Sequence, residues 1–99
     1  MTPFKFAFIF MCRGFSHEKQ KALINHNGTE VSVYGVDSLE EAVELSKKLL
    51  RENVKLIELC GAFCEDGARK IVEATDNKVA VGFVTHSESE EEKFKALFG

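Results

Sequence analysis

The sequence of 99 residues has no tryptophan and only one proline, and it lacks the stretch of about 20 apolar residues that a membrane-spanning helix requires. Its opening, MTPFKFAFIFM, also lacks the charged leader and the small-residue cleavage site of a signal peptide. We therefore expect a cytoplasmic protein that has no membrane partner. In that reducing compartment its three cysteines should be free thiols.

Clustered basic charge and nucleotide-binding motifs are missing as well. The net charge is −3 and the tail carries the acidic stretch Glu88–Glu92, which argues against a nucleic-acid partner because phosphate binding depends on grouped Lys and Arg. Neither G-x-G-x-x-G nor G-x-x-x-x-G-K-[ST] occurs, so we expect no cofactor. The C-x3-C spacing of Cys60 and Cys64 is not a strong zinc pattern, and we expect no metal.

The composition that remains is that of one folded domain, with 44% hydrophobic and 29% charged residues. Apolar stretches with the length and pattern of strands alternate with segments of helical character. Ser38 and Glu41 form a capping box at the start of the clearest helix. Over a single domain of residues 1–99, the predicted strands are 4–11, 30–36, 55–60 and 78–84, and the predicted helices are 17–25, 39–50, 64–75 and 88–98.

Strands that alternate with helices predict a parallel sheet with right-handed crossovers. The strand at 4–11 is apolar on both faces, so we expect helices to cover the sheet above and below. The predicted fold is a small three-layer α/β/α domain with a four-stranded parallel sheet of order 2-1-3-4, similar to half of a flavodoxin or Rossmann fold.

The fourth strand is an edge in this order, yet its residues are apolar on both faces. Exposed apolar edges promote aggregation in soluble proteins. We therefore expect this strand, the helix at 88–98, or both to be covered in a homodimer. The alternative is that the tail helix folds back over its own sheet.

Parallel strands place their carboxyl ends at one edge of the sheet, where ligands bind in open α/β folds. In the predicted order this edge collects Cys12, Arg13 and Gly14 after the first strand, Asp37 after the second, Cys60, Gly61, Ala62 and Phe63 after the third, and Thr85 and His86 after the fourth. We expect a small-molecule site there.

Three of the residues near this edge are catalytic candidates. Glu58 is a carboxylate in an otherwise apolar strand, a setting that suits a general acid or base. Cys60 precedes a predicted helix start and, with His86 as the base, makes a candidate nucleophile pair. The alternatives are structural: Glu58 is paired with Arg13, a lysine or a backbone N–H, and Cys60 only packs.

Arg13 is the candidate contact for a small carboxylate ligand, because its guanidinium is a forked donor that matches a carboxylate. The alternative is a surface ion pair with Asp37. The backbone N–H groups of Gly61, Ala62 and Phe63 lead into a helix and are further candidate ligand contacts.

Several segments resemble a family of short bacterial and archaeal proteins that is catalogued as a domain of unknown function. The shared segments are the opening FKFAFIFM, Gly35–Glu41, IELCGAF at Ile57–Phe63, KVAVGFVTH at Lys78–His86 and the closing Phe98-Gly99. In that family a glycine commonly follows the phenylalanine, where this chain has Cys64. The resemblance implies no activity. The IELCGAF segment also resembles one βα unit of a TIM barrel, which is an analogy of fold only.

Two functional hypotheses follow from these patterns. The first is a small-molecule binding protein or small enzyme that holds a carboxylate-bearing ligand around Glu58 and Cys60. The second is a noncatalytic, homo-oligomeric interaction module that acts through its apolar edge and its tail helix.

Overall fold

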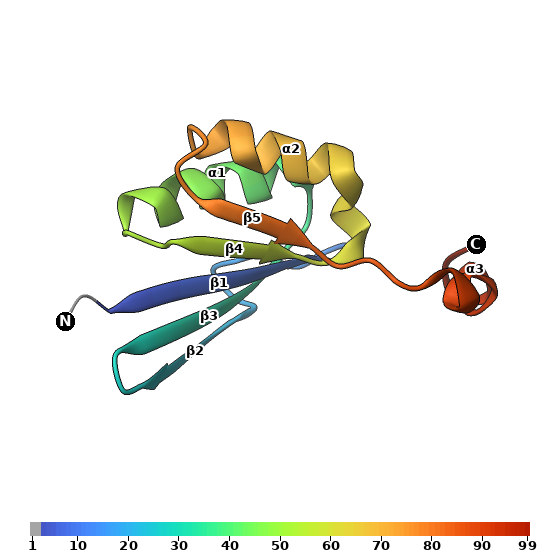
Figure 1. Ribbon diagram of the computed structural model, residues 1–99, viewed down its shortest axis with the longest axis horizontal. Helices are drawn as coiled ribbons and strands as arrows, with labels where there is room; N and C mark the ends of the chain where they lie inside the picture. Colours follow the sequence, from blue (N-terminus) through green and yellow to red (C-terminus); the bar gives the residue numbers. More distant parts are fainter. Residues whose placement is uncertain (1–2) are drawn as a thin grey trace.

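The computed structural model describes residues 3–99, which form a five-stranded sheet with two helices packed on one face (Figure 1). The strands are β1 (Phe4–Met11), β2 (Lys21–His26), β3 (Thr29–Val36), β4 (Leu56–Leu59) and β5 (Ala80–Phe83). The helices are α1 (Leu39–Arg51), α2 (Cys64–Ala74) and α3 (Glu91–Phe98), with short 3-10 helices η1 (Gly61–Phe63) and η2 (Glu88–Glu90). None of the helices is both long enough and apolar enough to cross a membrane, within the residues that the structure describes.

The sheet has the order β2-β3-β1-β4-β5. Strands β3, β1, β4 and β5 are parallel, and β2 is antiparallel to β3. The predicted α/β class and largely parallel sheet are confirmed. The predicted number of four strands is wrong, because it omits the edge strand β2; the other four strands lie in the relative order predicted, β3-β1-β4-β5.

The helix predicted at 17–25 is also wrong, since this region contains β2. The apolar run Ala22–Ile24 lies within β2, and Asn27-Gly28 forms the two-residue hairpin turn between β2 and β3, with φ of 48° at Asn27 and 83° at Gly28. Positive φ at both positions is the signature of a type I′ turn, for which Asn-Gly is the preferred sequence.

Loss of that helix changes the layers of the fold. The crossovers from β3 to β4 and from β4 to β5 run in the same direction across the sheet, so right-handed connections place α1 and α2 on the same face (Figure 1). The predicted three-layer arrangement is therefore wrong, and the domain has two layers. Because β1 and β3 are joined through the hairpin, no crossover helix is available for the other face.

The core lies between the sheet and these two helices. Ala7 and Ile9 of β1 are fully buried against them, as are Ile57 and Leu59 of β4. The helices contribute buried side chains on their inward stripes, namely Ala42, Leu45 and Leu49 of α1 and Ala68 and Ile71 of α2. The core side chains of β1 and β4 hold these two strands side by side, so their carboxyl ends meet at the edge where the site lies.

The opposite face of the sheet is apolar and uncovered, and we call it the open face. Alternation along the strands gives this face Phe4, Phe6 and Phe8 of β1, Val31 and Val33 of β3, and Ile24 of β2. Phe4 is 45% exposed and Ile24 is 60% exposed. Within residues 3–99, no helix lies over this face of the sheet (Figure 1).

Candidate functional site

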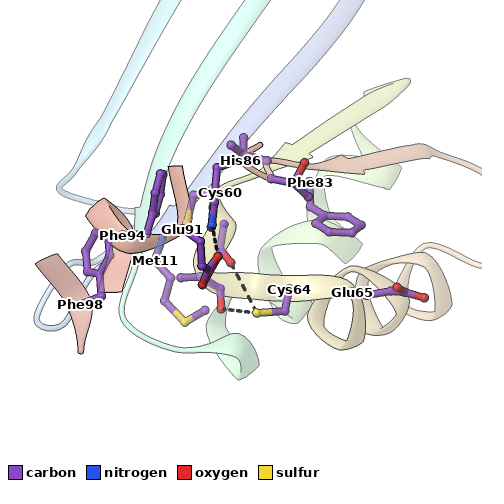
Figure 2. Close-up of a pocket in the computed structure, with 13 residues that line it drawn as sticks. Met11, Cys60, Cys64, Glu65, Phe83, His86, Glu91, Phe94 and Phe98 are labelled. Carbon is purple, nitrogen blue, oxygen red and sulfur yellow. Dashed lines mark hydrogen bonds and ion pairs between the residues drawn. The ribbon is translucent and has the colours of Figure 1, made fainter. Parts of the chain in front are cut away.

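A cavity of about 760 Å³ opens at the edge where β1, β4 and β5 end (Figure 2). Met11 and Cys60 come from the ends of the two central strands, and Ala62 comes from the 3-10 helix that follows β4. Thr85 and further residues after β5 form another side. The cavity therefore lies at the sheet edge where the sequence predicted a ligand site.

Helix α3 forms the far wall of this cavity through Phe94 and Phe98. The ring of His86 stacks on Phe94, with centroids 3.7 Å apart and planes 10° apart. His86 Nε2 lies 2.6 Å from Glu91 Oε2 at the start of the same helix. These two contacts hold α3 beside the end of β5, as Figure 2 shows.

Cys60 and His86 both line the cavity, but each makes its polar contact with a different residue. The Cys60 Sγ accepts a hydrogen bond from the backbone N–H of Met11 at 3.3 Å. His86 is engaged by Glu91, as described above. The nucleophile pair predicted from the sequence is thus brought to one cavity without a hydrogen bond between its members among the described residues, and its role stays a prediction.

Cys64, at the start of α2, lines the cavity in a strained backbone conformation. Its φ is 57° and its ψ is −176°, at the border of a region that is essentially restricted to glycine. Its Sγ lies 3.6 Å from the carbonyl oxygen of Gly61, a weak contact. The strained residue lines the cavity, and strained backbone conformations are often found at functional sites.

The predicted site residues separate into two groups. Those that line the cavity are Cys60, Gly61, Ala62, Thr85 and His86. Those that do not line it are Glu58, Cys12, Arg13, Gly14 and Phe63. Phe63 instead belongs to the core, where it is 4% exposed.

The turn after β1 holds three of the residues outside the cavity. Cys12, Arg13 and Gly14 are exposed there, and Gly14 adopts a φ of 85°. The backbone N–H of Gly14 donates a hydrogen bond to the Asp37 carboxylate. Asp37 therefore fixes the turn through its backbone, and no ion pair joins it to Arg13 among the described residues.

Glu58 lies on the open face of the sheet. Its neighbours in register are Phe8 on β1 and Gly82 on β5. The side chain is partly buried, and its carboxylate lies over the glycine, where no side chain competes for the space. Glu58 is thus separated from the cavity that contains Cys60, although only one residue stands between them.

Most of the cavity residues that the sequence did not predict come from the tail and from strand ends. They are Met11, Cys64, Glu65, Phe83, Val84, Glu91, Phe94 and Phe98. The spacing of Phe94 and Phe98 places both rings on one side of a helix, and this signal was available. The pattern does not predict where that helix lies relative to β5.

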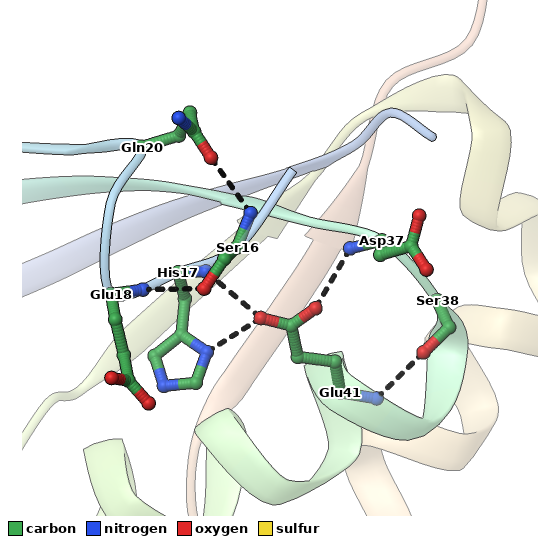
Figure 3. Close-up of polar contacts among 7 residues, drawn as sticks. All are labelled: Ser16, His17, Glu18, Gln20, Asp37, Ser38 and Glu41. Atoms are coloured by element: carbon green, nitrogen blue, oxygen red, sulfur yellow. Dashed lines mark hydrogen bonds and ion pairs between the residues drawn. The ribbon is translucent and has the colours of Figure 1, made fainter. Parts of the chain in front are cut away.

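A second polar cluster, away from the cavity, ties the loop after β1 to the start of α1 (Figure 3). Ser38 Oγ accepts from the backbone N–H of Glu41, which confirms one half of the predicted capping box; the returning bond from the Ser38 N–H to the Glu41 carboxylate is not formed. The Glu41 carboxylate accepts the backbone N–H groups of Asp37 and His17, and His17 Nδ1 lies 2.7 Å from it. Partial burial favours a higher pKa for Glu41, but these hydrogen bonds outweigh it and hold the pKa below its usual 4.5.

The charges around the cavity limit what it can hold. Glu65 and Glu91 are among its lining residues, and no lysine or arginine of the described chain is. Within residues 3–99, no group of three or more His, Cys, Asp or Glu side chains is arranged to hold a metal ion. The chemical groups of the cavity are apolar side chains, two thiols, the Thr85 hydroxyl, the Glu65 carboxylate and one histidine–glutamate pair.

Comparison with known proteins identifies the family of this chain. Residues 4–99 match DUF6506, a family of unknown function, and the chain belongs to it. The resemblance noted in the sequence is thereby confirmed. No curated protein and no solved structure matches the chain.

Proposed function

We propose that this member of the DUF6506 family is a small-molecule binding protein whose ligand lies in the cavity between the strand ends and α3. The cavity itself carries the proposal. Its volume of about 760 Å³ falls in the range of about 300–1,000 Å³ that is typical of ligand pockets. Its position, beyond the carboxyl ends of parallel strands, is where open α/β sheets bind their ligands.

The lining matches the usual composition of such pockets, in which apolar walls surround a few polar groups. Met11, Phe83, Phe94 and Phe98 provide thioether and aromatic surface. The polar groups are the two thiols, the Thr85 hydroxyl, the Glu65 carboxylate and the His86–Glu91 pair. A ligand with a flat apolar body fits this surface better than a strongly polar one does.

We further propose that the ligand is neutral or positively charged. The cavity contains two glutamates and, among the described residues, no lysine or arginine, so an anion would meet like charge. This changes the ligand class expected from the sequence, because the carboxylate hypothesis rested on Arg13. That residue lies in the exposed turn after β1 and does not line the cavity.

Binding is favoured over catalysis by the polar contacts of the two reactive side chains. The thiol of Cys60 accepts from a backbone N–H, and His86 is engaged by Glu91.

The three cysteines are free thiols, which supports the expectation of a reducing compartment such as the cytoplasm.

The proposal is tested with a fluorescent apolar probe, N-phenyl-1-naphthylamine, which is neutral and emits strongly only when it leaves water. Titration of the wild-type protein should give saturable binding. Ala62 is exposed and lines the cavity, so the ring introduced by Ala62→Phe takes up part of the cavity without disturbing the core. We expect this variant to bind the probe at least about tenfold more weakly, a loss of roughly 1.4 kcal/mol.

The matched control is Ala96→Phe, because Ala96 is an exposed alanine of α3 that does not line the cavity. Its affinity for the probe should equal that of the wild type. Equal binding by wild type and Ala62→Phe would contradict the proposal, since the probe would then occupy another apolar surface. Tighter binding of the anionic probe 8-anilinonaphthalene-1-sulfonate than of the neutral one would contradict the assigned ligand charge.

A further inference from the structure

We propose that two copies of this chain form a dimer in which the open face of each sheet is covered by the other copy, with α3 of each copy packed on the partner's open face. The argument does not use the identity of a ligand, although Phe94 and Phe98 also line the cavity. It starts from two apolar surfaces on the same chain, one without a covering helix and the other on α3, where Leu97 and Phe98 are largely exposed.

The first surface is the open face. Phe4 is 45% exposed and Ile24 is 60% exposed, and the neighbouring Phe6, Phe8 and Val33 are only partly buried. These side chains come from three adjacent strands and form a continuous apolar area. Continuous apolar areas on soluble proteins mark interaction sites.

The second surface is one side of α3. Phe94, Leu97 and Phe98 follow a three- and four-residue spacing, which places them together on the helix. Leu97 is 75% exposed and Phe98 is 80% exposed. A helix of eight residues is too short to be stable in water without packing, so α3 needs a surface to cover this side.

The chain cannot bring these two surfaces together by itself in this conformation. Figure 1 shows α3 beyond the carboxyl end of β5, clear of both faces of the sheet. The stacking of His86 on Phe94 and the His86–Glu91 contact hold it there. A second copy supplies an open face for α3 and an α3 for the open face. Because the two contacts are equivalent, they form a closed dimer with twofold symmetry.

The area of the chain agrees with this arrangement. Its accessible surface is 6699 Å², whereas a compact monomer of 11.1 kDa should expose about 5,700 Å². The excess of about 1,000 Å² is close to the roughly 800 Å² that each partner buries in a standard interface. The radius of gyration, 14.1 Å, likewise exceeds the value of about 13 Å expected for a compact chain of this length.

Sedimentation velocity of matched variants tests the proposal. The wild type at micromolar concentration should have twice the 11.1 kDa chain mass. Leu97→Asp removes an exposed side chain that does not line the cavity, and it should convert the protein to the single-chain mass. Ala96→Asp, at the neighbouring position on the opposite side of α3, should remain dimeric.

The open face has its own matched pair. Leu23 and Ile24 are adjacent on β2 and almost equally exposed, at 59% and 60%, but they lie on opposite faces of the sheet. Ile24→Asp should raise the dissociation constant of the dimer at least about tenfold, and Leu23→Asp should leave it unchanged. A monomeric wild type, a dimer that survives Leu97→Asp, or equal effects of the two β2 variants would each overturn the proposal.

Discussion

The carboxylate of Glu58 occupies the space above Gly82, on the strand beside it. A Cβ atom placed on Gly82 would lie 2.6 Å from Glu58 Oε1, and the three nearest atoms all belong to Glu58. The missing side chain on β5 is therefore what allows a carboxylate to lie flat on the open face. This relationship explains how an acidic residue is accommodated in the middle of an apolar sheet.

The contact predicts a coupling between these two positions. Alanine is more stable than glycine within a strand by about 0.5–1 kcal/mol, and Gly82→Ala should give this gain in a Glu58→Ala background. In the wild-type background the gain should be smaller, because the new methyl group displaces the carboxylate. Urea unfolding of the four proteins measures the difference, and strictly additive effects would contradict the contact.

Cys64 provides a second prediction, because its φ of 57° with a ψ of −176° is costly for any residue with a side chain. Cys64→Gly should raise the free energy of unfolding by about 1 kcal/mol as the strain is relieved. Cys64→Ala is the control, since it removes the thiol and keeps the Cβ atom. If the alanine variant gains as much stability as the glycine variant, backbone strain is not the cause.

Ser38, the N-cap of α1, and Ser46, within the helix, should show opposite changes in protein stability when each is replaced by alanine. The Ser46 hydroxyl is fully buried and has no hydrogen-bond partner among the described residues, so Ser46→Ala should stabilise the protein by about 1 kcal/mol. Ser38 caps the helix, so Ser38→Ala should destabilise it by about 1 kcal/mol. Thermal unfolding compares the two variants, and a loss of stability in both would show that the Ser46 hydroxyl is satisfied.

The lowered pKa of Glu41 predicts how stability depends on pH. Because the pKa in the folded protein lies below the usual 4.5, the unfolded chain takes up the proton more readily. The contribution of this carboxylate is complete above about pH 5 and is lost as the pH falls through the native pKa.

Glu41→Gln should therefore reduce stability at neutral pH, and the difference from wild type should shrink as the pH falls from about 6 to about 3. Denaturant unfolding across that range gives the difference at each pH. Glu44→Gln, on the exposed side of the same helix, is the control and should change stability little, since its partner is a surface lysine. A Glu41→Gln difference that is constant with pH would contradict the account.

Much of the fold followed from local patterns. Strands β1, β3, β4 and β5 and helices α1 and α2 are where apolar runs, alternation and the Ser38–Glu41 box indicated. The exception is β2, where a short apolar run carries no clear period and the Asn27-Gly28 turn decides the structure. Asn27-Gly28 is a hairpin signal, and a hairpin at this position replaces the first predicted helix, so the third layer is absent as well.

The rule that parallel strands end at one edge brought Cys60, Ala62 and His86 to one cavity, and their functional role stays a prediction. The wall made by Phe94 and Phe98 depends on where α3 lies after residues 84–87, and the contacts of His86 with Phe94 and Glu91 that hold it there have no counterpart in a pattern of apolar residues. Glu58, a candidate because it is a carboxylate in an otherwise apolar strand, faces the open side of the sheet and does not line the cavity.

Native mass spectrometry after incubation with N-phenyl-1-naphthylamine tests the ligand-binding claim most directly, because it reports the bound molecule and the subunit number together. We predict a species of twice the 11.1 kDa chain mass that carries one probe molecule per chain. Ala62→Phe should retain the dimer and lose the probe. A wild-type protein that appears without the probe under these conditions would contradict the assignment of the cavity as a binding site.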